Sequence, residues 1–478
     1  MNELKELPKG WKCTNLKEVS DLIGDGLHGT PKYTADGEYY FINGNNLVDG
    51  EIIFKESTKR VNIDEYQKHK KNLNSSTILI SINGTLGNTA FYNQEKVILG
   101  KSACYVNLSD EADKHYVRYI LTSRIFINYA LKNASGSTIP NVSLKAMREF
   151  KIPLPPLPAQ QAIVSKIEEL FSELDKGVEN LKTAQQQLKV YRQAVLKWAF
   201  EGRLTNGINS NFNDLPDEHE LGMVAEPGAV YQSAKNLNND LKNLQDGLDL
   251  KSNKTKRLAG NQENHANQSN QGSDNGGLPE GWILTQLKDI CLIKRGKSKH
   301  RPRNEPSLFG GKYPFIQTGD IRNANGGFLS NYSQTYSKKG LEQSKLWPIG
   351  TLCITVAANI GETAILKMNA CFPDSVVGLV CNEEKVLNSY TNYFFISHKS
   401  KLEALAPATA QKNINVDILE KVKIPLPSIK IQTKVIEEIE SRLSVADKME
   451  ESIQQSLVQA ESLRQSILKK AFEGRLVK

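Results

Sequence analysis

The chain contains one long sequence written twice. The five residues Lys-Ile-Pro-Leu-Pro occur at Lys151–Pro155 and again at Lys423–Pro427, and the six residues Ala-Phe-Glu-Gly-Arg-Leu occur at Ala199–Leu204 and again at Ala471–Leu476. Both pairs have the same offset of 272 residues, from 151 to 423 and from 199 to 471. A single duplication of this length predicts two similar domains in a pseudo-twofold arrangement, because a solenoid would need three or more short repeats. A two-part chain in turn suggests a two-part target.

Positive charge is concentrated outside one central segment. The 478 residues contain 61 Lys and Arg against 53 Asp and Glu, which is a formal net charge of +8. Residues 205–277 contain 6 Lys and Arg and 10 Asp and Glu, a balance of −4, so the remainder of the chain has +12. The central segment is also rich in Asn, Gln, Ser and Gly, which predicts a flexible polar linker. The basic remainder favours a polyanionic partner such as nucleic acid.

Cysteine spacing and hydropathy narrow the class of protein. The six cysteines form no Cys-x-x-Cys pair and no Cys/His cluster with zinc spacing, so we expect reduced thiols and no metal site. No signal sequence opens the chain, and no apolar run approaches the roughly 18 residues that a membrane span needs. These features predict a cytoplasmic protein without membrane contact.

Each copy of the repeat mixes short strands with helices. Four apolar runs are typical of buried strands: residues 78–82 and 104–108 in the first copy, and 352–356 and 376–380 in the second. A helical pattern follows in each copy, at residues 116–131 and 388–405. The Ile-Pro-Leu-Pro segments must be extended, because proline disfavours helical backbone at its own position and at the one before. We therefore expect an α+β fold with two mixed α/β domains.

A long amphipathic helix follows each Pro-rich segment. From about Ala159 to Phe200, and again from Lys430 to Phe472, apolar residues recur every three to four positions, which is typical of a coiled-coil seam. We expect these helices to pair antiparallel and to separate the two domains; the alternative is that each folds back on its own domain. The residues expected at the helix and partner interface are Ile163, Ile167, Leu170, Leu174, Leu181, Leu188, Val195, Val435, Ile439, Leu443, Ile453, Leu457, Leu463 and Ile467.

The candidate catalytic motifs are weak. Gly24–Gly29 fits Gly-x-Gly-x-x-Gly, but Thr30 and Pro31 follow where a dinucleotide site needs a helix, which favours a surface loop. Asp374 with Glu383 resembles a metal-dependent nuclease pair, yet Gly100 occupies the position of Asp374 in the first copy. Neither an adenine-methylation motif nor a phosphate-binding loop occurs. We therefore expect no catalytic, cofactor-binding or metal residues.

Basic loops are the clearest candidate contacts. Lys294–Arg303 contains six Lys and Arg side chains, and Lys68–Lys71 is a smaller counterpart in the first copy. Such runs contact phosphates, while Arg, Asn and Gln on neighbouring loops read bases; the alternative is a solvated surface run. The predicted DNA-binding residues of the first copy are Gly26, His28, Thr30, Lys68, Lys70, Lys71, Asn83, Thr85, Asn88, Ser135, Ser137 and Asn141. Those of the second copy are Lys294, Arg295, Lys297, Lys299, Arg301, Arg303, Thr318, Arg322, Asn359, Gln411, Lys412 and Asn413.

Three segments in a fixed order carry a family resemblance. They are Ala134–Asn141, with the sequence Ala-Ser-Gly-Ser-Thr-Ile-Pro-Asn, then Phe150–Gln161, and then a long helix that ends at Ala199–Leu204. With the duplication, this order resembles the specificity subunit of type I restriction-modification enzymes over nearly the whole chain. The second copy has Ala408–Asn415 in the first of these positions and lacks the Ser-Gly-Ser/Thr pattern there.

The resemblance implies a non-catalytic subunit of a phage-defence system that binds double-stranded DNA. Two target-recognition domains would each read one half of a split sequence, and the paired helices would set their spacing. The helices would also dock two modification subunits that use S-adenosylmethionine, and two restriction and translocase subunits that use ATP and Mg²⁺ would join them. The chain itself would hold no cofactor. The alternatives are a coiled-coil structural adaptor without sequence-specific DNA readout and a nuclease that uses Asp374 and Glu383.

This interpretation divides the chain into five parts. They are a first target-recognition domain at 1–157, a central spacer helix at 158–204, a flexible linker at 205–277, a second target-recognition domain at 278–429 and a distal spacer helix at 430–478.

Overall fold

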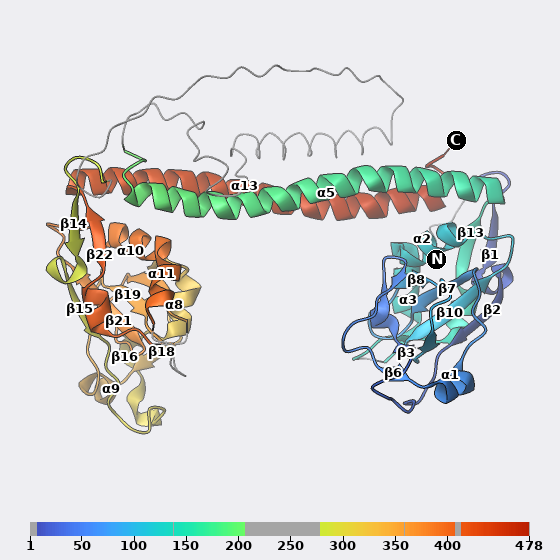
Figure 1. Cartoon of the computed structure of the whole chain (residues 1–478), viewed down its shortest axis with the longest axis horizontal. Helices are drawn as coiled ribbons and strands as arrows, with labels where there is room; N and C mark the ends of the chain where they lie inside the picture. Colours follow the sequence, from blue (N-terminus) through green and yellow to red (C-terminus); the bar gives the residue numbers. More distant parts are fainter. Residues whose placement is uncertain (1–6, 137, 206–277, 358, 407–412, 478) are drawn as a thin grey trace, which may run out of the picture. The chain divides into compact units, whose positions relative to one another are not determined.

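The computed structural model describes residues 7–136, 138–205, 278–357, 359–406 and 413–477 (Figure 1). Within these ranges the chain forms two compact units. Unit 1 combines the residues up to Leu181 with those from Gln454 onward, and unit 2 contains the described residues from Lys182 to Ile453. Nearly all of the predicted linker, from residue 206 to residue 277, lies outside the described residues.

A four-stranded antiparallel sheet lies at the centre of unit 1, in the order β2–β10–β7–β8. Its strands are β2 (Ser20–Asp25), β7 (Thr77–Ser81), β8 (Thr89–Phe91) and β10 (Ala103–Leu108). Every residue of β7 and β10 is buried. The two apolar runs predicted as strands in the first copy are therefore the central strands of this sheet, where β-branched side chains pack well on both faces.

Smaller sheets and short helices complete unit 1. A second sheet has the order β6–β3–β9, and two-stranded sheets form from β1 with β13, β4 with β5 and β11 with β12. The bounds of these strands are β1 (Lys12–Asn15), β3 (Tyr39–Ile42), β4 (Leu47–Val48), β5 (Glu51–Ile52), β6 (Arg60–Val61), β9 (Val97–Leu99), β11 (Ala134–Ser135), β12 (Asn141–Val142) and β13 (Lys151–Leu154). The helices are η1 (Leu16–Val19), η2 (Gly44–Asn46), α1 (Ile63–His69), α2 (Lys114–Thr122), α3 (Arg124–Asn133) and α4 (Leu144–Glu149).

Unit 2 repeats this plan with a five-stranded sheet in the order β15–β21–β19–β20–β17. Its strands are β15 (Cys291–Arg295), β17 (Phe328–Leu329), β19 (Leu352–Thr355), β20 (Thr363–Leu366) and β21 (Val376–Cys381). Two-stranded sheets pair β14 (Ile283–Gln286) with β22 (Lys423–Leu426) and β16 (Phe309–Phe315) with β18 (Gln334–Tyr336). The helices are η3 (Leu287–Asp289), η4 (Pro306–Leu308), α8 (Thr318–Ala324), α9 (Lys338–Glu342), α10 (Asn388–Ser397), α11 (Lys399–Leu405) and α12 (Val416–Glu420).

The Ile-Pro-Leu-Pro segments are strands, as predicted. β13 pairs antiparallel with β1 and β22 pairs antiparallel with β14. The predicted helical stretches, by contrast, are each two helices. Ser123 separates α2 from α3, and its buried hydroxyl donates to the carbonyl of Ile120 at 2.7 Å. His398 separates α10 from α11 in the same way along the second copy. Neither break contains Pro or Gly, and the apolar helical pattern continues across both, which is why the sequence predicted one helix at each place.

Two helices of 44 residues contribute to both units: α5 (Leu157–Phe200) and α13 (Ile429–Phe472). In unit 1, Arg464 forms an ion pair with Asp175, and its guanidinium lies 4.3 Å from the centroid of the Phe171 ring. In unit 2, Arg192 forms ion pairs with Asp447 at 2.6 Å and with Glu450 at 2.9 Å. Since residue numbers rise along α5 as they fall along α13, the helices are antiparallel.

The core of unit 1 lies between its sheet, α2 and the two long helices. Tyr119 of α2 packs edge-on against Phe171 of α5, with ring centroids 5.7 Å apart, and Figure 1 shows α2 below the two long helices in this unit. One apolar cluster contains Tyr116 and Ile120 from α2, Ile167 from α5, and Ile467 and Phe472 from α13. The two long helices thus pair with each other, as predicted, and the end of α13, a helix of the second copy, packs against the globular part of the first copy rather than folding back on its own.

The predicted seam residues are mostly buried. Twelve of the fourteen positions are buried, whereas Leu443 and Leu457 are partly exposed. The burial follows the three- and four-residue spacing of a helix face that packs on a partner. Among the described residues, no helix is both long and apolar enough to cross a membrane.

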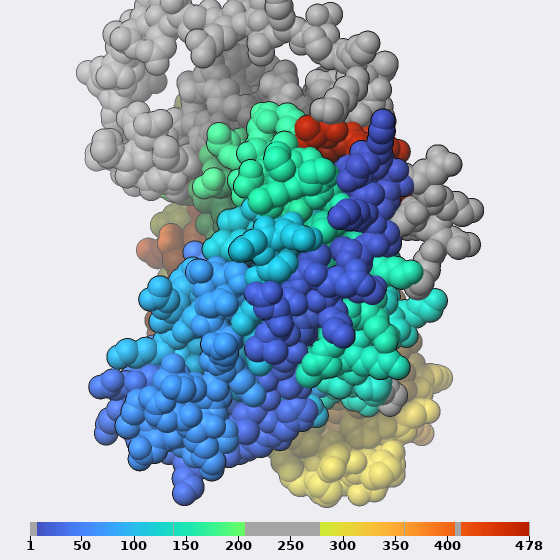
Figure 2. All heavy atoms as spheres, turned by 90° about the vertical axis from the view of Figure 1, so that its right-hand side faces the viewer, coloured from blue at the N-terminus to red at the C-terminus, as the bar shows by residue number. Residues whose placement is uncertain are grey.

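Both long helices end in the same glycine cap. Gly202 and Gly474 have φ values of +73° and +69°, and the following amides, of Arg203 and Arg475, donate to carbonyls five residues back, as in a Schellman motif. A side chain on Gly474 would collide with Pro8. In Figure 2, red atoms of the C-terminal segment lie beside dark blue atoms of the N-terminal segment.

One buried glutamine anchors the start of each long helix. Gln160 is fully buried; its Oε1 accepts from the amide of Asp113 at 2.8 Å, and its Nε2 donates to the carbonyls of Glu111 and Pro155 at 2.9 Å. Gln432 makes the same three contacts in unit 2, with Leu387, Lys385 and Pro427. The duplication therefore extends to individual hydrogen bonds.

Candidate nucleic-acid interface

Several predicted contact loops of unit 1 lie at one end of its sheet. The end of β2 pairs with the start of β10, since Asp25 lies opposite Cys104, and the end of β7 meets the same point, since Ser81 lies opposite Ala103. The loop that follows β2 and the turn that follows β7 must therefore leave the sheet side by side. Polar and exposed residues, including His28, Thr30 and Thr85, lie on these loops.

The turn after β7 is joined to the segment that carries the family resemblance. Asn83 Nδ2 donates to Oδ1 of Asn141 at 2.9 Å, and the two residues also form a β-bridge. Ser135 Oγ donates to the carbonyl of Asn141 at 3.3 Å across β11 and β12. Three predicted contact residues from two distant segments thus meet. Asn88 lies at the end of the same turn, and Ser137 lies outside the described residues.

The loop after β2 begins at a close approach of two backbones. Gly26 is buried, and a side chain there would collide with the carbonyl groups of Leu99 and Gly100. The amide of Leu27 donates to the carbonyl of Leu99 at 2.7 Å. His28 lies 2.6 Å from Asp25, between Nε2 and Oδ2. Gly26 is thus required by packing, while His28 and Thr30 are exposed and available to a ligand.

Gly26→Ala is expected to destabilise unit 1 by about 1 to 3 kcal/mol, because an added methyl group meets backbone atoms that cannot rotate away. The measurement is native-state hydrogen exchange of the β10 amides. Gly29→Ala is the matched control, since a methyl group at Gly29 would have no neighbour within 4 Å. Equal exchange in the two variants would contradict the packing role of Gly26.

The basic segment of unit 1 lies against the same loop. Lys68 is in the last turn of α1, and Lys70 and Lys71 follow the helix. The buried carboxylate of Glu65 on α1 accepts from the amide of Lys32 at 3.1 Å. Helix α1, from whose C-terminal end the three lysines extend, is therefore hydrogen-bonded to the loop that contains His28 and Thr30.

The structural counterpart of this segment differs from the one predicted. Asn62 caps α1 after β6, and Ser337 caps α9 after β18. Lys68–Lys71 therefore corresponds to Gln343–Leu346, the segment that follows α9, whereas the sequence suggested Lys294–Arg303. The two runs were matched by their charge alone. The run Lys294–Arg303 continues from β15, so its position corresponds to the loop after β2.

Unit 2 brings its own loops together in the same way. Asn413 forms a β-bridge with Ala357, the position equivalent to Asn83, and the amide of Ile414 donates to the carbonyl of Val356 at 3.0 Å. Arg295 adds a contact that unit 1 lacks, since its guanidinium donates to Oδ1 of Asn413 at 2.8 Å and to the carbonyl of Ile414 at 2.9 Å. Gln411 and Lys412 lie outside the described residues.

The remaining candidates of unit 2 lie on α8 and on the turn after β19. Thr318 and Arg322 belong to α8, whose first turn is held by a capping box between Gln317 and Asp320. Arg322 is exposed. Asn359 is an exposed residue of the turn between β19 and β20, and its carbonyl accepts from the hydroxyl of Thr355.

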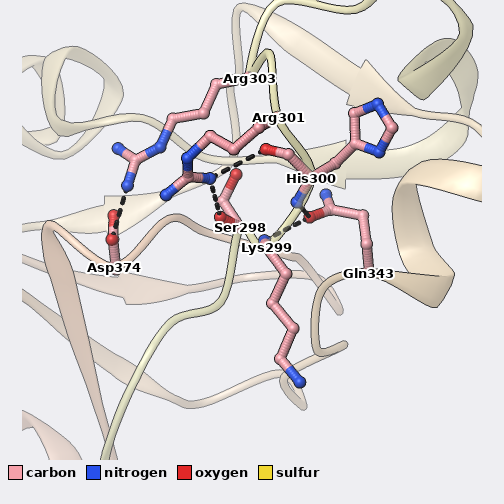
Figure 3. A network of polar contacts seen from close by, with 7 residues as sticks. All are labelled: Ser298, Lys299, His300, Arg301, Arg303, Gln343 and Asp374. Carbon is pink, nitrogen blue, oxygen red and sulfur yellow. Dashed lines mark hydrogen bonds and ion pairs between the residues drawn. The ribbon is translucent and has the colours of Figure 1, made fainter.

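The basic loop of unit 2 is exposed but internally connected (Figure 3). The side chains of Lys294, Lys297, Lys299, Arg301 and Arg303 are exposed. Arg303 forms an ion pair with Asp374 at 2.7 Å, and Nη1 of Arg301 donates to the carbonyls of Ser298 and His300 at 2.8 Å. The guanidinium groups thus have partners within the protein, while Figure 3 shows the Lys299 side chain pointing away from them.

The candidate nuclease pair does not form one site. Asp374 precedes β21 and Glu383 follows it, so the six-residue strand separates them, a distance of roughly 17 to 20 Å along a strand of this length. Asp374 pairs with Arg303. Two carboxylates at opposite ends of one strand cannot share a metal ion.

Several site residues had no clear signal in the sequence. In unit 2, Gln343 and Lys345 border the basic loop. In unit 1, Asn43 lies beside Gly100, and its Oδ1 accepts a hydrogen bond from Ser102 Oγ at 3.1 Å. Repeat matching could have found the anchoring glutamines Gln160 and Gln432, because they occupy equivalent positions in the two copies.

Both units thus present loops at the end of a buried sheet, joined to a segment that precedes a long helix. The family model for the type I restriction modification DNA specificity domain matches residues 8–183 and 279–459. The chain belongs to this family. Each match begins just before the first strand of one unit and ends within a long helix, so this type I specificity protein contains the domain twice. As a member of the family, the chain is a sequence-specific DNA-recognition subunit.

Named relatives extend over most of the chain. The type I restriction enzyme EcoKI specificity subunit of Escherichia coli (strain K12) is 21% identical over 497 residues, covering 98% of this chain and 90% of the relative. The EcoBI specificity subunit of Escherichia coli is 22% identical over 417 residues, covering 84% of this chain and 73% of the relative. Both relatives carry the name of the family shown by the domain match.

Solved structures of type I specificity proteins share the fold. A chain from a structure of the type I R-M system has a TM-score of 0.65 and 18% identity, covering 98% of this chain and 99% of that chain. The HsdS subunit from Thermoanaerobacter tengcongensis has a TM-score of 0.55 and 18% identity, covering 99% and 100%. The predicted α+β class, with two mixed domains and two long antiparallel helices, is confirmed.

Proposed function

We propose that the chain reads a bipartite target in double-stranded DNA, with one half-site recognised by each unit. The observation that carries the proposal is the repeated junction, in which Asn83 and Asn141 meet in unit 1 and Ala357 and Asn413 meet in unit 2. Loops at equivalent positions differ in sequence, so each unit offers different side chains to the base edges. The residues predicted from the sequence are the proposed DNA contacts, except four that support the loops: Gly26, which is buried, and Arg295, Arg301 and Arg303, which have partners within the protein.

We further propose that the chemistry belongs to partner subunits. Two modification subunits that bind S-adenosylmethionine would dock on α5 and α13 and methylate adenine, and two restriction and translocase subunits that use ATP and Mg²⁺ would complete the complex. The chain would act without a cofactor of its own, in the cytoplasm. The pairing of Asp374 with Arg303 supports this division, because one of the two candidate catalytic acids of unit 2 has a structural partner and the other, Glu383, lies at the opposite end of β21.

The test is co-expression of the chain with its modification subunit, followed by mapping of methylated adenine in a plasmid library by long-read sequencing. We expect one motif with two defined halves and an unspecified spacer. A well-formed complex that produces no motif would contradict the proposal and favour a structural adaptor. Methylation at a single undivided sequence would contradict the assignment of one half-site to each unit.

Matched turn variants make the experiment specific for each unit. Thr85 and Asn359 are exposed and occupy equivalent turns, after β7 and after β19. Thr85→Ala is expected to relax only one half of the motif, and Asn359→Ala only the other, since loss of one base contact corresponds to about 1 to 3 kcal/mol of discrimination. If either variant altered both halves equally, the two units would not read separately.

A further inference from the structure

The basic loop of unit 2, residues 294–303, is held in one shape by contacts to the rest of the unit (Figure 3). Oε1 of Gln343 accepts from the amides of Lys299 at 2.6 Å and His300 at 3.1 Å, and Ser344 Oγ donates to the carbonyl of Lys297 at 2.8 Å. Arg303 is tied to Asp374 across 71 residues of sequence. A loop with its amides, a carbonyl and a guanidinium engaged is preorganised, so binding a ligand orders little further.

Three lysines converge beside this held loop. Lys345 adjoins the segment that accepts the loop amides, and its Nζ lies 3.8 Å from the centroid of the buried Trp347 ring. Lys294 on β15 lies opposite Gly378 of β21, where a side chain would collide with the same Trp347 ring. Lys297 lies in the loop beside Ser344, whose hydroxyl donates to the Lys297 carbonyl. The strand register and the Trp347 ring therefore bring Lys294 and Lys345 to one side of the sheet.

The electrostatics agree with this placement. Partial burial, followed by the positive charges of Lys294 and Lys297, lowers the pKa of Lys345. None of the ion pairs found among the described residues includes any of these three lysines. Like charges held together without a carboxylate repel each other, and a bound anion relieves that repulsion.

We propose that Lys294, Lys297 and Lys345 form a clamp for the phosphate backbone of duplex DNA, and that Asp374 and Gln343 are positioning residues that hold the loop for them. The lysines supply compact point charges with three donors each, which suits contact to phosphate without base reading. The three arginines of the loop have structural partners instead. This inference rests on the proposed function, and it assigns backbone affinity and base reading to different residues of unit 2.

The clamp is tested by the salt dependence of binding. The full chain, purified with its modification subunit, is titrated onto a duplex that contains the mapped target and onto one that lacks it. The slope of log K against log salt is negative, and each phosphate contact contributes about 0.9 to its magnitude. Changing Lys294, Lys297 and Lys345 together to Met is expected to reduce this magnitude by about 2 to 3. The decrease should be the same on both duplexes, because phosphate contacts carry no sequence information.

A matched triple variant separates local contact from net charge. Lys288, Lys421 and Lys423 are exposed and lie together at the other end of β15, where the amide of Leu287 donates to the carbonyl of Val422 at 3.0 Å. Their replacement by Met removes the same charge and should leave the slope within about 0.5 of the wild type. An equal decrease in both triple variants, or no decrease in the first, would overturn the clamp. Lys297→Met alone, at an exposed position, gives the same test with an expected decrease of about 1.

The positioning role is tested by a change whose sign is decisive. Asp374→Ala removes a negative charge near the loop, so charge alone predicts tighter binding of both duplexes. If Asp374 positions the loop through Arg303, binding should instead weaken by about two- to fivefold, the range for a partly exposed ion pair. Tighter binding would overturn the positioning role. A wild-type complex that never prefers its target over the other duplex would refute the proposed function itself, which is a different outcome from unchanged slopes.

Discussion

Replacing Phe472 by alanine is expected to lower the free energy of unfolding of unit 1 by about 3 to 5 kcal/mol, because removal of a large buried ring leaves a cavity that the surroundings fill only partly. Phe472 is fully buried near the end of α13. Its ring packs edge-on against Tyr116, with centroids 5.5 Å apart, inside the cluster that also contains residues of the sheet and of α5. The loss would therefore reach elements distant in sequence.

Hydrogen exchange resolved by mass spectrometry measures this effect in each unit separately. Amides of β10 should exchange faster in Phe472→Ala, while those of β21 in unit 2 should be unchanged. Val458→Ala, on the same helix but 60% exposed, should differ from the wild type by less than about 0.5 kcal/mol. Unchanged protection of β10 in Phe472→Ala would show that α13 does not complete the core of unit 1.

Gln160→Leu is the second change with a large expected effect. The side chain is fully buried, and its three hydrogen bonds join the start of α5 to the segment before α2 and to the end of the Pro-rich strand. Leucine has a similar volume but removes the hydrogen bonds to the amide of Asp113 and to the carbonyls of Glu111 and Pro155, of which Pro155 is a buried residue and Asp113 partly buried. We expect a loss of about 2 to 4 kcal/mol, since each buried group left unpaired costs about 1 to 3 kcal/mol and a partly buried one costs less.

Gln161→Leu is a closely matched control. The neighbouring residue has the same side chain and the same place in the helix, but it is exposed. Its substitution should change the free energy of unfolding by less than about 0.5 kcal/mol, whereas hydrogen exchange at α2 should rise only in Gln160→Leu. Similar protection of α2 in both variants would mean that the three hydrogen bonds do not anchor the helix.

The duplication and its hydrophobic periods predicted the main elements. The runs at 78–82 and 352–356 are β7 and β19, and the long amphipathic pattern is α5 and α13. These segments could be predicted because a buried helix face or strand places apolar residues at a regular spacing in the sequence. The divisions at Ser123 and His398 were not legible, because the apolar pattern continues across each break and no Pro or Gly marks it.

The arrangement of the candidate site was less predictable. Asn83 and Asn141 were both named from the sequence, but their hydrogen bond spans 58 residues and depends on the fold. The same holds for Arg303 and Asp374, which were assigned to a phosphate contact and to a possible metal site before the structure placed them together. Lys345 had no signal at all, since its significance depends on neighbours from β15 and on Trp347. Composition indicates which side chains are available, whereas partners are a property of tertiary structure.

The membership of α13 in unit 1 has a consequence for synthesis of the chain. Residues up to β13 leave the ribosome early, but the cluster they form includes Leu463, Ile467 and Phe472. The apolar faces of α2 and the first part of α5 therefore stay uncovered while the intervening polypeptide is translated, and partly covered intermediates of this kind are prone to aggregate. Synthesis of unit 1 starts first, but its last segment is translated at the end of the chain, so unit 1 completes its folding after translation. Nascent chains stalled before residue 454 should therefore depend on chaperones.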